Sequence, residues 1–248
     1  MSNRIGGKSK YSISMISSRG CVFKCEFCAI QNRGKVAFRT LENFYNELLQ
    51  IKKDFPLCDG ITLLDETFTL NSKHAIGVAN IFKDLNVPFE CNSRIDTLNE
   101  NIINALAEAP CKEIRIGLET GSQHLLDKMQ KGIDLKKAKN VFRKLKDSGI
   151  PVKIYLMHGF PGENMNTTFE TINYLQEISD CIQRISLYRF TPLPGSPIYK
   201  KNVTWGRNWE DYTIYDNNIH WWGSKEDYLE MTQSYKILEK VIKKFDNL

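Results

Sequence analysis

Three cysteines near the start of the chain, Cys21, Cys25 and Cys28, have the spacing C-x3-C-x2-C. Thiolates hold iron–sulfur clusters, and a [4Fe–4S] cube usually takes four of them. Three thiolates on one short loop would leave one iron open to a further ligand, which favours a catalytic cluster over an electron carrier. Zinc is another metal that thiolates bind, but it usually takes four ligands. No Cys or His follows the three at a suitable short spacing.

Segments typical of strands and helices alternate along the rest of the chain. Apolar residues at steps of three and four predict the helices, and short β-branched runs predict the strands between them. The expected strands are residues 12–17, 60–64, 89–93, 113–118, 152–158 and 184–190, and the expected helices are residues 41–54, 72–85, 100–109, 135–148 and 167–179. Ser72 and Asn166 are expected to cap helices at their amino ends, and Gly149 is expected to end one.

This alternation predicts the fold class. Strand–helix–strand units imply parallel strands joined by right-handed crossovers. Six such units predict an α/β fold, a partial (β/α)6 TIM-like barrel, with a doubly wound sheet as the alternative. In both folds the chemistry lies at the carboxyl ends of the strands. Polar or glycine-rich residues follow every predicted strand: the cysteine loop, Asp65-Glu66-Thr67, Asn92-Ser93-Arg94, Glu119-Thr120-Gly121, Gly159-Phe160-Pro161-Gly162-Glu163 and Thr191-Pro192-Leu193-Pro194-Gly195.

The alternating pattern ends near residue 198, which predicts two parts. Residues 1–198 are expected to form the barrel core, and residues 199–248 a C-terminal extension that packs on the barrel or caps it. The extension begins with an irregular stretch, residues 199–224, that is rich in aromatic side chains. A helix over residues 225–245 is expected to close the chain.

Composition limits the classes of function. The 248 residues carry a formal net charge of +5. Their lysines are scattered along the predicted helices, which indicates solvated helix faces. No nucleic-acid recognition motif accompanies them. No run reaches the roughly 20 apolar residues of a membrane span, and no signal peptide is recognisable. A cytoplasmic protein without a membrane or nucleic-acid partner is therefore expected. Thiols stay reduced there, so Cys58, Cys91, Cys111 and Cys181 are expected to be core or loop thiols.

The cysteine loop, with Phe27 directly before its last cysteine, resembles the signature of the radical S-adenosylmethionine (SAM) superfamily. The resemblance covers residues 11–199. Residues 117–122, 159–163 and 191–197 look most like the core of its cobalamin-binding branch, and related motifs occur in methylthiotransferases and oxygen-independent coproporphyrinogen oxidases. That branch normally carries a cobalamin-binding domain before the barrel. About ten residues precede the first predicted strand here, so this chain departs from the pattern and is expected to lack that domain.

The resemblance implies a radical SAM enzyme, an oxidoreductase or transferase acting on a small molecule or a biosynthetic intermediate. Cys21, Cys25 and Cys28 would hold a [4Fe–4S] cluster whose open iron binds the amino and carboxylate groups of SAM. An electron from a flavodoxin- or ferredoxin-type reductant would then cleave SAM to methionine and a 5′-deoxyadenosyl radical. The cofactors would supply the reactive chemistry, and the protein would bind and orient them.

By the same resemblance, residues at the strand ends would contact SAM. The acidic pair after the second strand would face its amino group, Glu119 its ribose hydroxyls, and Lys131 its carboxylate, with Lys128 as the alternative base. Arg94 has a structural ion pair as its alternative role, and Tyr155 a place in the core. The expected SAM-contacting residues are Phe27, Asp65, Glu66, Asn92, Arg94, Glu119, Lys131, Tyr155, Gly159, Phe160 and Leu193.

Two other functions stay open on the sequence. One is the catalytic part of a cobalamin-dependent radical SAM methyltransferase whose cobalamin is held elsewhere. The other is a non-catalytic iron–sulfur protein for electron transfer or sensing, which predicts a closed cluster with four ligands and no SAM site. The sequence indicates neither the substrate nor the oligomeric state.

Overall fold

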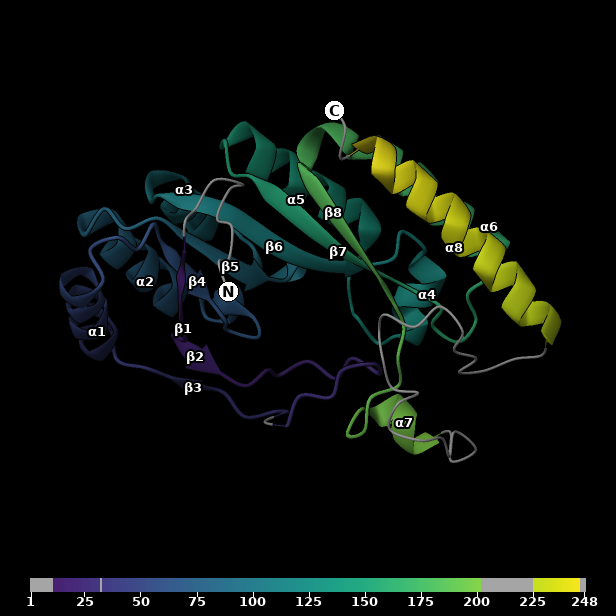
Figure 1. Ribbon diagram of the computed structural model, residues 1–248, viewed down its shortest axis with the longest axis horizontal. Helices are drawn as coiled ribbons and strands as arrows, with labels where there is room; N and C mark the ends of the chain where they lie inside the picture. The colour runs from purple at the N-terminus through teal and green to yellow at the C-terminus, as the bar shows by residue number, and fades with distance from the viewer. Residues whose placement is uncertain (1–10, 32, 202–224, 246–248) are drawn as a thin grey trace.

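The computed structural model describes residues 11–31, 33–201 and 225–245 (Figure 1). Six parallel strands form one sheet in the order β1-β4-β5-β6-β7-β8. This is also their order along the chain, and Figure 1 shows helices along the outer side of the curved sheet. The predicted partial TIM-like barrel is therefore confirmed. The strands are β1 (Ile13–Met15), β4 (Ile61–Leu63), β5 (Phe89–Ser93), β6 (Cys111–Glu119), β7 (Val152–His158) and β8 (Arg184–Arg189).

The predicted helices are present with small shifts at their ends. They are α1 (Leu41–Asp54), α2 (Ser72–Asp84), α3 (Glu100–Glu108), α5 (Leu135–Asp147), α6 (Met165–Glu177) and α8 (Lys225–Phe245). The sequence analysis missed the shorter elements. These are the antiparallel pair β2 (Ser18–Arg19) and β3 (Ala37–Phe38), the helices α4 (Gln123–Lys128) and α7 (Pro197–Lys201), and three 3₁₀ turns at Phe68–Leu70, Ile95–Thr97 and Ser179–Cys181.

Two predicted helix caps are wrong by one or two residues. Asn71, not Ser72, caps α2, because its side chain accepts a hydrogen bond from the amide of His74. Asn164 caps α6 in a reciprocal arrangement with Thr167, which leaves Asn166 inside the first turn. Several neighbouring residues here have side chains that can cap a helix, so the sequence alone does not show which of them is the N-cap. The predicted stop at Gly149 is confirmed, since α5 ends there and this glycine has a φ of 69°.

The hydrophobic core lies between the sheet and the outer helices. In β6 the side chains of Ile114, Ile116 and Leu118 are fully buried and point to the helices. The alternate residues of the same strand are charged or glycine and point to the inner, concave side of the sheet. The rings of Phe82 and Phe89 stack with centroids 4.2 Å apart in the core. This packing leaves the concave side to polar side chains.

The closing helix α8 packs beside α6 and β8 on the outer side of the sheet. Leu238 and Ile242 on this helix belong to the main core. Most of the aromatic-rich stretch that precedes α8, residues 202–224, lies outside the described residues. The predicted division at residue 198 stays a prediction. Within the described part of the chain, no helix has the length and apolar character needed to cross a membrane.

Candidate active site

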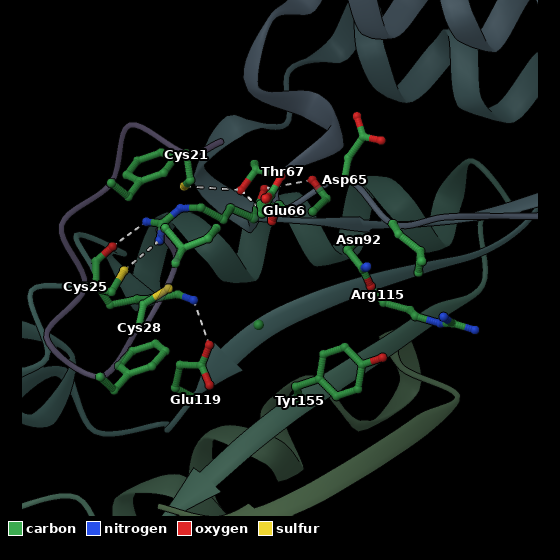
Figure 2. Close-up of a pocket in the computed structure, with 18 residues that line it drawn as sticks. Cys21, Cys25, Cys28, Asp65, Glu66, Thr67, Asn92, Arg115, Glu119 and Tyr155 are labelled. Carbon is green, nitrogen blue, oxygen red and sulfur yellow. Dashed lines mark hydrogen bonds and ion pairs between the residues drawn. The ribbon is translucent and has the colours of Figure 1, made fainter. Parts of the chain in front are cut away.

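A cavity of about 440 Å³ opens at the carboxyl ends of the strands, between the cysteine loop and the ends of β4 to β7 (Figure 2). It contains eleven of the fourteen residues that the sequence predicts for the site. Its lining is Cys21, Phe23, Cys25, Phe27, Cys28, Ile30, Leu64, Asp65, Glu66, Thr67, Asn92, Ser93, Arg94, Arg115, Gly117, Glu119, Lys131 and Tyr155. The parallel sheet brings these residues together because its strands end at one edge.

The three cysteines of the loop line one side of this cavity (Figure 2). All are free thiols; Cys25 is buried, and Cys21 and Cys28 are half-buried. Among the residues that the structure describes, no three Cys, His, Asp or Glu side chains lie close enough to hold a single metal ion. Three thiols along one side of a cavity fit a cluster, in which each thiolate binds its own iron.

The cysteine loop is held in place by the turn that precedes Lys131. The amide of Glu26 donates to the carbonyl of Met129 at 2.9 Å, and the Glu26 carboxylate accepts from the Gln130 side chain at 2.6 Å. Within the loop, the amide of Gly34 donates to the carbonyl of Cys21 at 2.8 Å. Sequence reasoning missed Glu26 and Gln130, because nothing in the sequence links two residues 104 positions apart.

Arg94 connects the cysteine loop to the turn that carries Lys131. Its side chain is nearly fully buried and forms a two-point ion pair with Asp96, with nitrogen–oxygen distances of 2.9 and 2.8 Å. The same guanidinium donates to the sulfur of Cys25 at 3.4 Å and to the carbonyl of Lys131. It also lies over the ring of Phe23, 3.6 Å from the ring centroid. The ion pair that the sequence analysis weighed for Arg94 is present, together with a direct contact to a cysteine.

Opposing effects act on the thiol of Cys25. Burial raises the pKa of Cys25, while the positive charges of Lys131 and Arg94 act to lower it. A cluster bound to three thiolates brings negative charge into the cavity. The two cations beside Cys25 can offset that charge, so the residues present fit an anionic iron–sulfur group.

The acidic segment after β4 supports the start of the cysteine loop. Both carboxylate oxygens of Asp65 accept hydrogen bonds: one from the amide of Ser17 at 2.7 Å, the other from the hydroxyls of Ser17 at 2.7 Å and Ser18 at 2.5 Å. Glu66 accepts from the amide of Gly20 at 3.0 Å. The hydroxyl of Thr67 lies 3.7 Å from the sulfur of Cys21. Asp65 is thus occupied by the protein, and Glu66 is the better placed of the pair to receive a ligand.

Glu119 and Lys131 form an ion pair within the cavity, with 2.7 Å between the ammonium nitrogen and a carboxylate oxygen. Glu119 has a φ of 71°, which is uncommon for a residue with a side chain, and it lies at an irregularity in the pairing of β6 with β7. Lys131 lies between Gln130 and Gly132, which also have positive φ values of 50° and 73°. Strained backbone that aims two charged groups into one cavity is typical of functional sites.

Gly117 leaves the space that this ion pair needs. A Cβ atom at position 117 would lie 2.6 Å from a carboxylate oxygen of Glu119 and 3.0 Å from the ammonium nitrogen of Lys131. We expect Gly117→Ala to displace both charged groups and to weaken SAM binding about tenfold, which corresponds to roughly 1.4 kcal/mol. Equilibrium dialysis with labelled SAM measures this. Gly149→Ala, at the end of α5 and outside the cavity lining, controls for a general loss of stability and should leave SAM affinity unchanged. Equal affinities for the parent and Gly117→Ala would contradict the prediction.

Asn92, Arg115 and Tyr155 form the part of the cavity farthest from the cysteines (Figure 2). Burial raises the pKa of Tyr155, so its hydroxyl stays protonated at neutral pH. The sequence analysis missed Arg115, because the strand pattern gives no sign that its side chain extends along the cavity wall. Arg115 pairs with Glu90 and Glu113 on the concave side of the sheet.

Three predicted contacts do not line the cavity, and their roles stay predictions. The amide of Gly159 donates to the carboxylate of Glu163 at 2.6 Å. Phe160 is buried in a small apolar cluster beside Phe190, with ring centroids 5.1 Å apart, and Phe27 packs against this cluster. Phe160 thus supports the aromatic residue of the cysteine loop from behind. The side chain of Leu193 is 41% exposed.

Glu163 makes the folded state sensitive to pH. Burial raises the pKa of Glu163 to about 8, against a usual value of 4.5, although the amides of Gly159 and Phe160 act to lower it. The folded protein therefore keeps a proton that the unfolded chain releases above its own pKa, and stability falls as pH rises from about 4.5 to 8. We expect Glu163→Gln to be more stable than the parent by on the order of 4 kcal/mol above pH 8, and by progressively less toward pH 5.

Urea unfolding of the cluster-free protein between pH 5 and pH 9 measures this difference. Glu170→Gln, at an exposed position on α6, is the matched control and should follow the parent at every pH. Burial lowers the pKa of the neighbouring His158 to about 3, so this imidazole stays neutral in the folded protein over the same range of pH. Parallel curves for the parent and Glu163→Gln would show that Glu163 does not hold the proton.

Comparison with known sequences agrees with this geometry. The sequence profile of the radical SAM superfamily matches residues 15–175. An uncharacterised methyltransferase from Pyrococcus horikoshii is 28% identical over 210 residues, which are 82% of this chain and 45% of that protein. A bacteriochlorophyllide d C-8(2)-methyltransferase from Chlorobaculum tepidum is 22% identical over 221 residues, 81% of this chain and 48% of that protein. The chain spans about half the length of the curated relatives it matches.

Solved structures show the same fold. The radical SAM methyltransferase TsrM from Kitasatospora setae, with cobalamin and a [4Fe–4S] cluster bound, has a TM-score of 0.67 at 17% identity. That comparison covers 76% of this chain and 36% of TsrM. The cobalamin-dependent SAM radical enzyme OxsB, with aqua-cobalamin and SAM bound, has a TM-score of 0.60 at 18% identity, over 94% of this chain and 31% of OxsB.

Proposed function

Because this chain belongs to the radical SAM superfamily of enzymes, we propose that it cleaves SAM reductively and uses the 5′-deoxyadenosyl radical on a small-molecule substrate. One observation carries the proposal: three loop thiols, three cations and three carboxylates line a single cavity of about 440 Å³. Cavities of this size suit ligands as large as SAM. The cysteines Cys21, Cys25 and Cys28 would hold the [4Fe–4S] cluster.

The bound cluster would supply one electron, received from a flavodoxin- or ferredoxin-type reductant, to the sulfonium of SAM. The S–C5′ bond would then break, methionine would keep the sulfur, and the carbon radical would take a hydrogen atom from the substrate. The chain's own residues bind and orient. Lys131 suits the methionine carboxylate as an ammonium donor, Glu119 the ribose hydroxyls as a charged acceptor, and Glu66 the amino group. Arg94 positions Cys25 and Lys131 together, since it contacts both.

Detection of 5′-deoxyadenosine tests the proposal. The protein would be reconstituted anaerobically with iron and sulfide, mixed with SAM and reduced with dithionite, and the products separated by liquid chromatography and mass spectrometry. We expect 5′-deoxyadenosine and methionine to form in equal amounts, and neither to form when the reductant is left out. Intact cluster without SAM cleavage would favour the electron-transfer or sensing alternative.

A methyltransferase is the second candidate. It is supported by two relatives that are named as methyltransferases and by the cobalamin in TsrM and OxsB. Cobalamin would then come from another chain or from a segment outside this sequence. Added methylcobalamin separates the two candidates: loss of its methyl group, dependent on SAM and reductant, favours the methyltransferase. An unchanged methylcobalamin pool alongside continuing SAM cleavage favours the first candidate.

A further inference from the structure

Three cations lie side by side on the concave side of the sheet: Arg115 on β6, Lys153 on β7 and Arg184 on β8. The strand pairing places Arg115 opposite Lys153, and Lys153 opposite Arg184. Adjacent strands are about 4.8 Å apart, so the three side chains leave the sheet in one row. We call these three residues the cation row.

Two carboxylates neutralise only part of this row. Glu113 contacts both arginines, with a nitrogen–oxygen distance of 3.0 Å to Arg115 and 2.8 Å to Nε of Arg184. Glu90 pairs with Arg115 and accepts a further hydrogen bond from Thr62 at 2.8 Å. Three positive charges therefore face two negative ones, and both carboxylates are engaged with the arginines.

Lys153 is the cation without a carboxylate partner among the residues that the structure describes. It is half-buried, and its ammonium nitrogen lies 5.1 Å from the ring centroid of Tyr155. Burial and the charges of Arg184 and Arg115 lower the pKa of Lys153, while the carboxylates of Glu113 and Glu90 act to raise it. Partly buried cations are normally paired, because desolvation penalises an isolated charge. The row thus lacks one anion.

The cation row lies toward the amino ends of β7 and β8, and of its three residues only Arg115 belongs to the lining of the candidate active site. Arg115 and Tyr155 line the SAM-sized cavity, and Tyr155 also lies against the ammonium group of Lys153. A molecule bound at Lys153 would therefore extend past the ring of Tyr155 toward the cavity. None of the three residues of the row is among those proposed to hold the cluster or SAM.

We propose that Lys153 and Arg184 bind an oxyanion group, a carboxylate or a phosphate, of the molecule on which this enzyme acts. An ammonium beside a guanidinium suits such a group, since each can donate to its oxygen atoms. The oxyanion would complete the charge balance of the row and orient the rest of the molecule along Tyr155. Assigning this group to the substrate rests on the proposed function, whereas the oxyanion site itself does not.

Acylation of lysines in the full-length protein tests the site without knowledge of the substrate. The cluster-loaded protein is treated with the N-hydroxysuccinimide ester of acetic acid in the presence of increasing inorganic phosphate or propionate, and each lysine is quantified by mass spectrometry. We expect at least one of the two anions to slow acylation of Lys153 about tenfold, with saturation. Lys112, an exposed lysine on β6, is the internal control and should react at a constant rate.

A pair of variants separates a built site from simple charge. Arg184→Gln should raise the phosphate or propionate concentration needed for half-protection of Lys153 about tenfold, the loss of roughly one charged hydrogen bond. Arg143→Gln removes the same charge from the exposed face of α5 and should leave that concentration unchanged. Equal effects of the two substitutions would show that only net charge matters, and would overturn the proposal.

The remaining outcomes are also decisive. Protection by phosphate alone assigns a phosphate group, and protection by propionate alone a carboxylate. Equal protection by chloride at the same ionic strength, protection without saturation, or a Lys153 that never reacts would each overturn the oxyanion site. Protection of Lys153 in a protein that does not cleave SAM would keep the site and remove its assignment to a radical substrate.

Discussion

We expect replacement of Cys25 with alanine to yield a protein that neither assembles a [4Fe–4S] cluster nor forms 5′-deoxyadenosine. Cys25 is the most buried of the three loop cysteines, and its sulfur accepts a hydrogen bond from Arg94. With two thiolates left, a [4Fe–4S] cluster would have two of its usual four protein ligands, and a second iron would be exposed to solvent. Iron and sulfide content after anaerobic reconstitution measures assembly, and chromatography of the SAM reaction measures cleavage. The expected loss is complete in both.

The control for this prediction is Cys58→Ala. Cys58 is a free, half-buried thiol that donates to the carbonyl of Gly60 at 3.1 Å and lies outside the cavity. That variant should assemble the cluster and cleave SAM at the parent's rate. Full iron content in Cys25→Ala would remove this residue from the ligand set, and the proposed function would then need another source of its third thiolate.

The second large effect is expected at Lys131. We predict that Lys131→Ala weakens SAM binding by about 100-fold while iron content stays at the parent level. One charge-assisted hydrogen bond to a carboxylate contributes about 1.5–3 kcal/mol, which is roughly a 10- to 150-fold change in Kd. The substitution also leaves the carboxylate of Glu119 unpaired in the cavity, where it would repel the carboxylate of SAM. Equilibrium dialysis of the cluster-loaded protein measures the affinity.

Lys128 provides a matched control. It lies three residues earlier at the end of α4, is exposed and is absent from the cavity lining, so Lys128→Ala should bind SAM as the parent does. Lys131→Arg, which keeps the charge, should recover part of the affinity. If Lys128→Ala showed the large loss and Lys131→Ala none, the roles of the two lysines would be exchanged.

Much of this fold could be predicted because the spacing of apolar residues along the chain differs between its strands and its helices. The predicted bounds of β5, β7 and α1 match the structure residue for residue, since each element carries a clear pattern between polar ends. The cavity followed from the same pattern. Once parallel strands are predicted, the residues after them must meet at one edge, and that is where Glu66, Asn92 and Glu119 lie.

Other features could not be predicted, because they depend on contacts between distant segments. The strands β2 and β3 contain two residues each and carry no period. Glu26 looks like an ordinary loop residue until the chain folds and places it beside Gln130. Arg115 and Lys153 each resemble a surface charge within a strand, and only the pairing of β6 with β7 puts them side by side. Gly159 and Phe160 follow a strand as expected, but their immediate neighbours are protein groups.

The contact between the cysteine loop and the segment after β8 has a mechanical consequence. In the described part of the chain, the strands β1 and β8 are the two edges of the six-stranded sheet, and no backbone ladder joins them. The loop that leaves β1 crosses this gap at the carboxyl end, where the amide of Ile198 donates to the carbonyl of Glu26 at 3.0 Å. The loop that carries the thiols therefore also connects the two edges of the open barrel. A metal group that ordered this loop would restrain both edge strands at the same time.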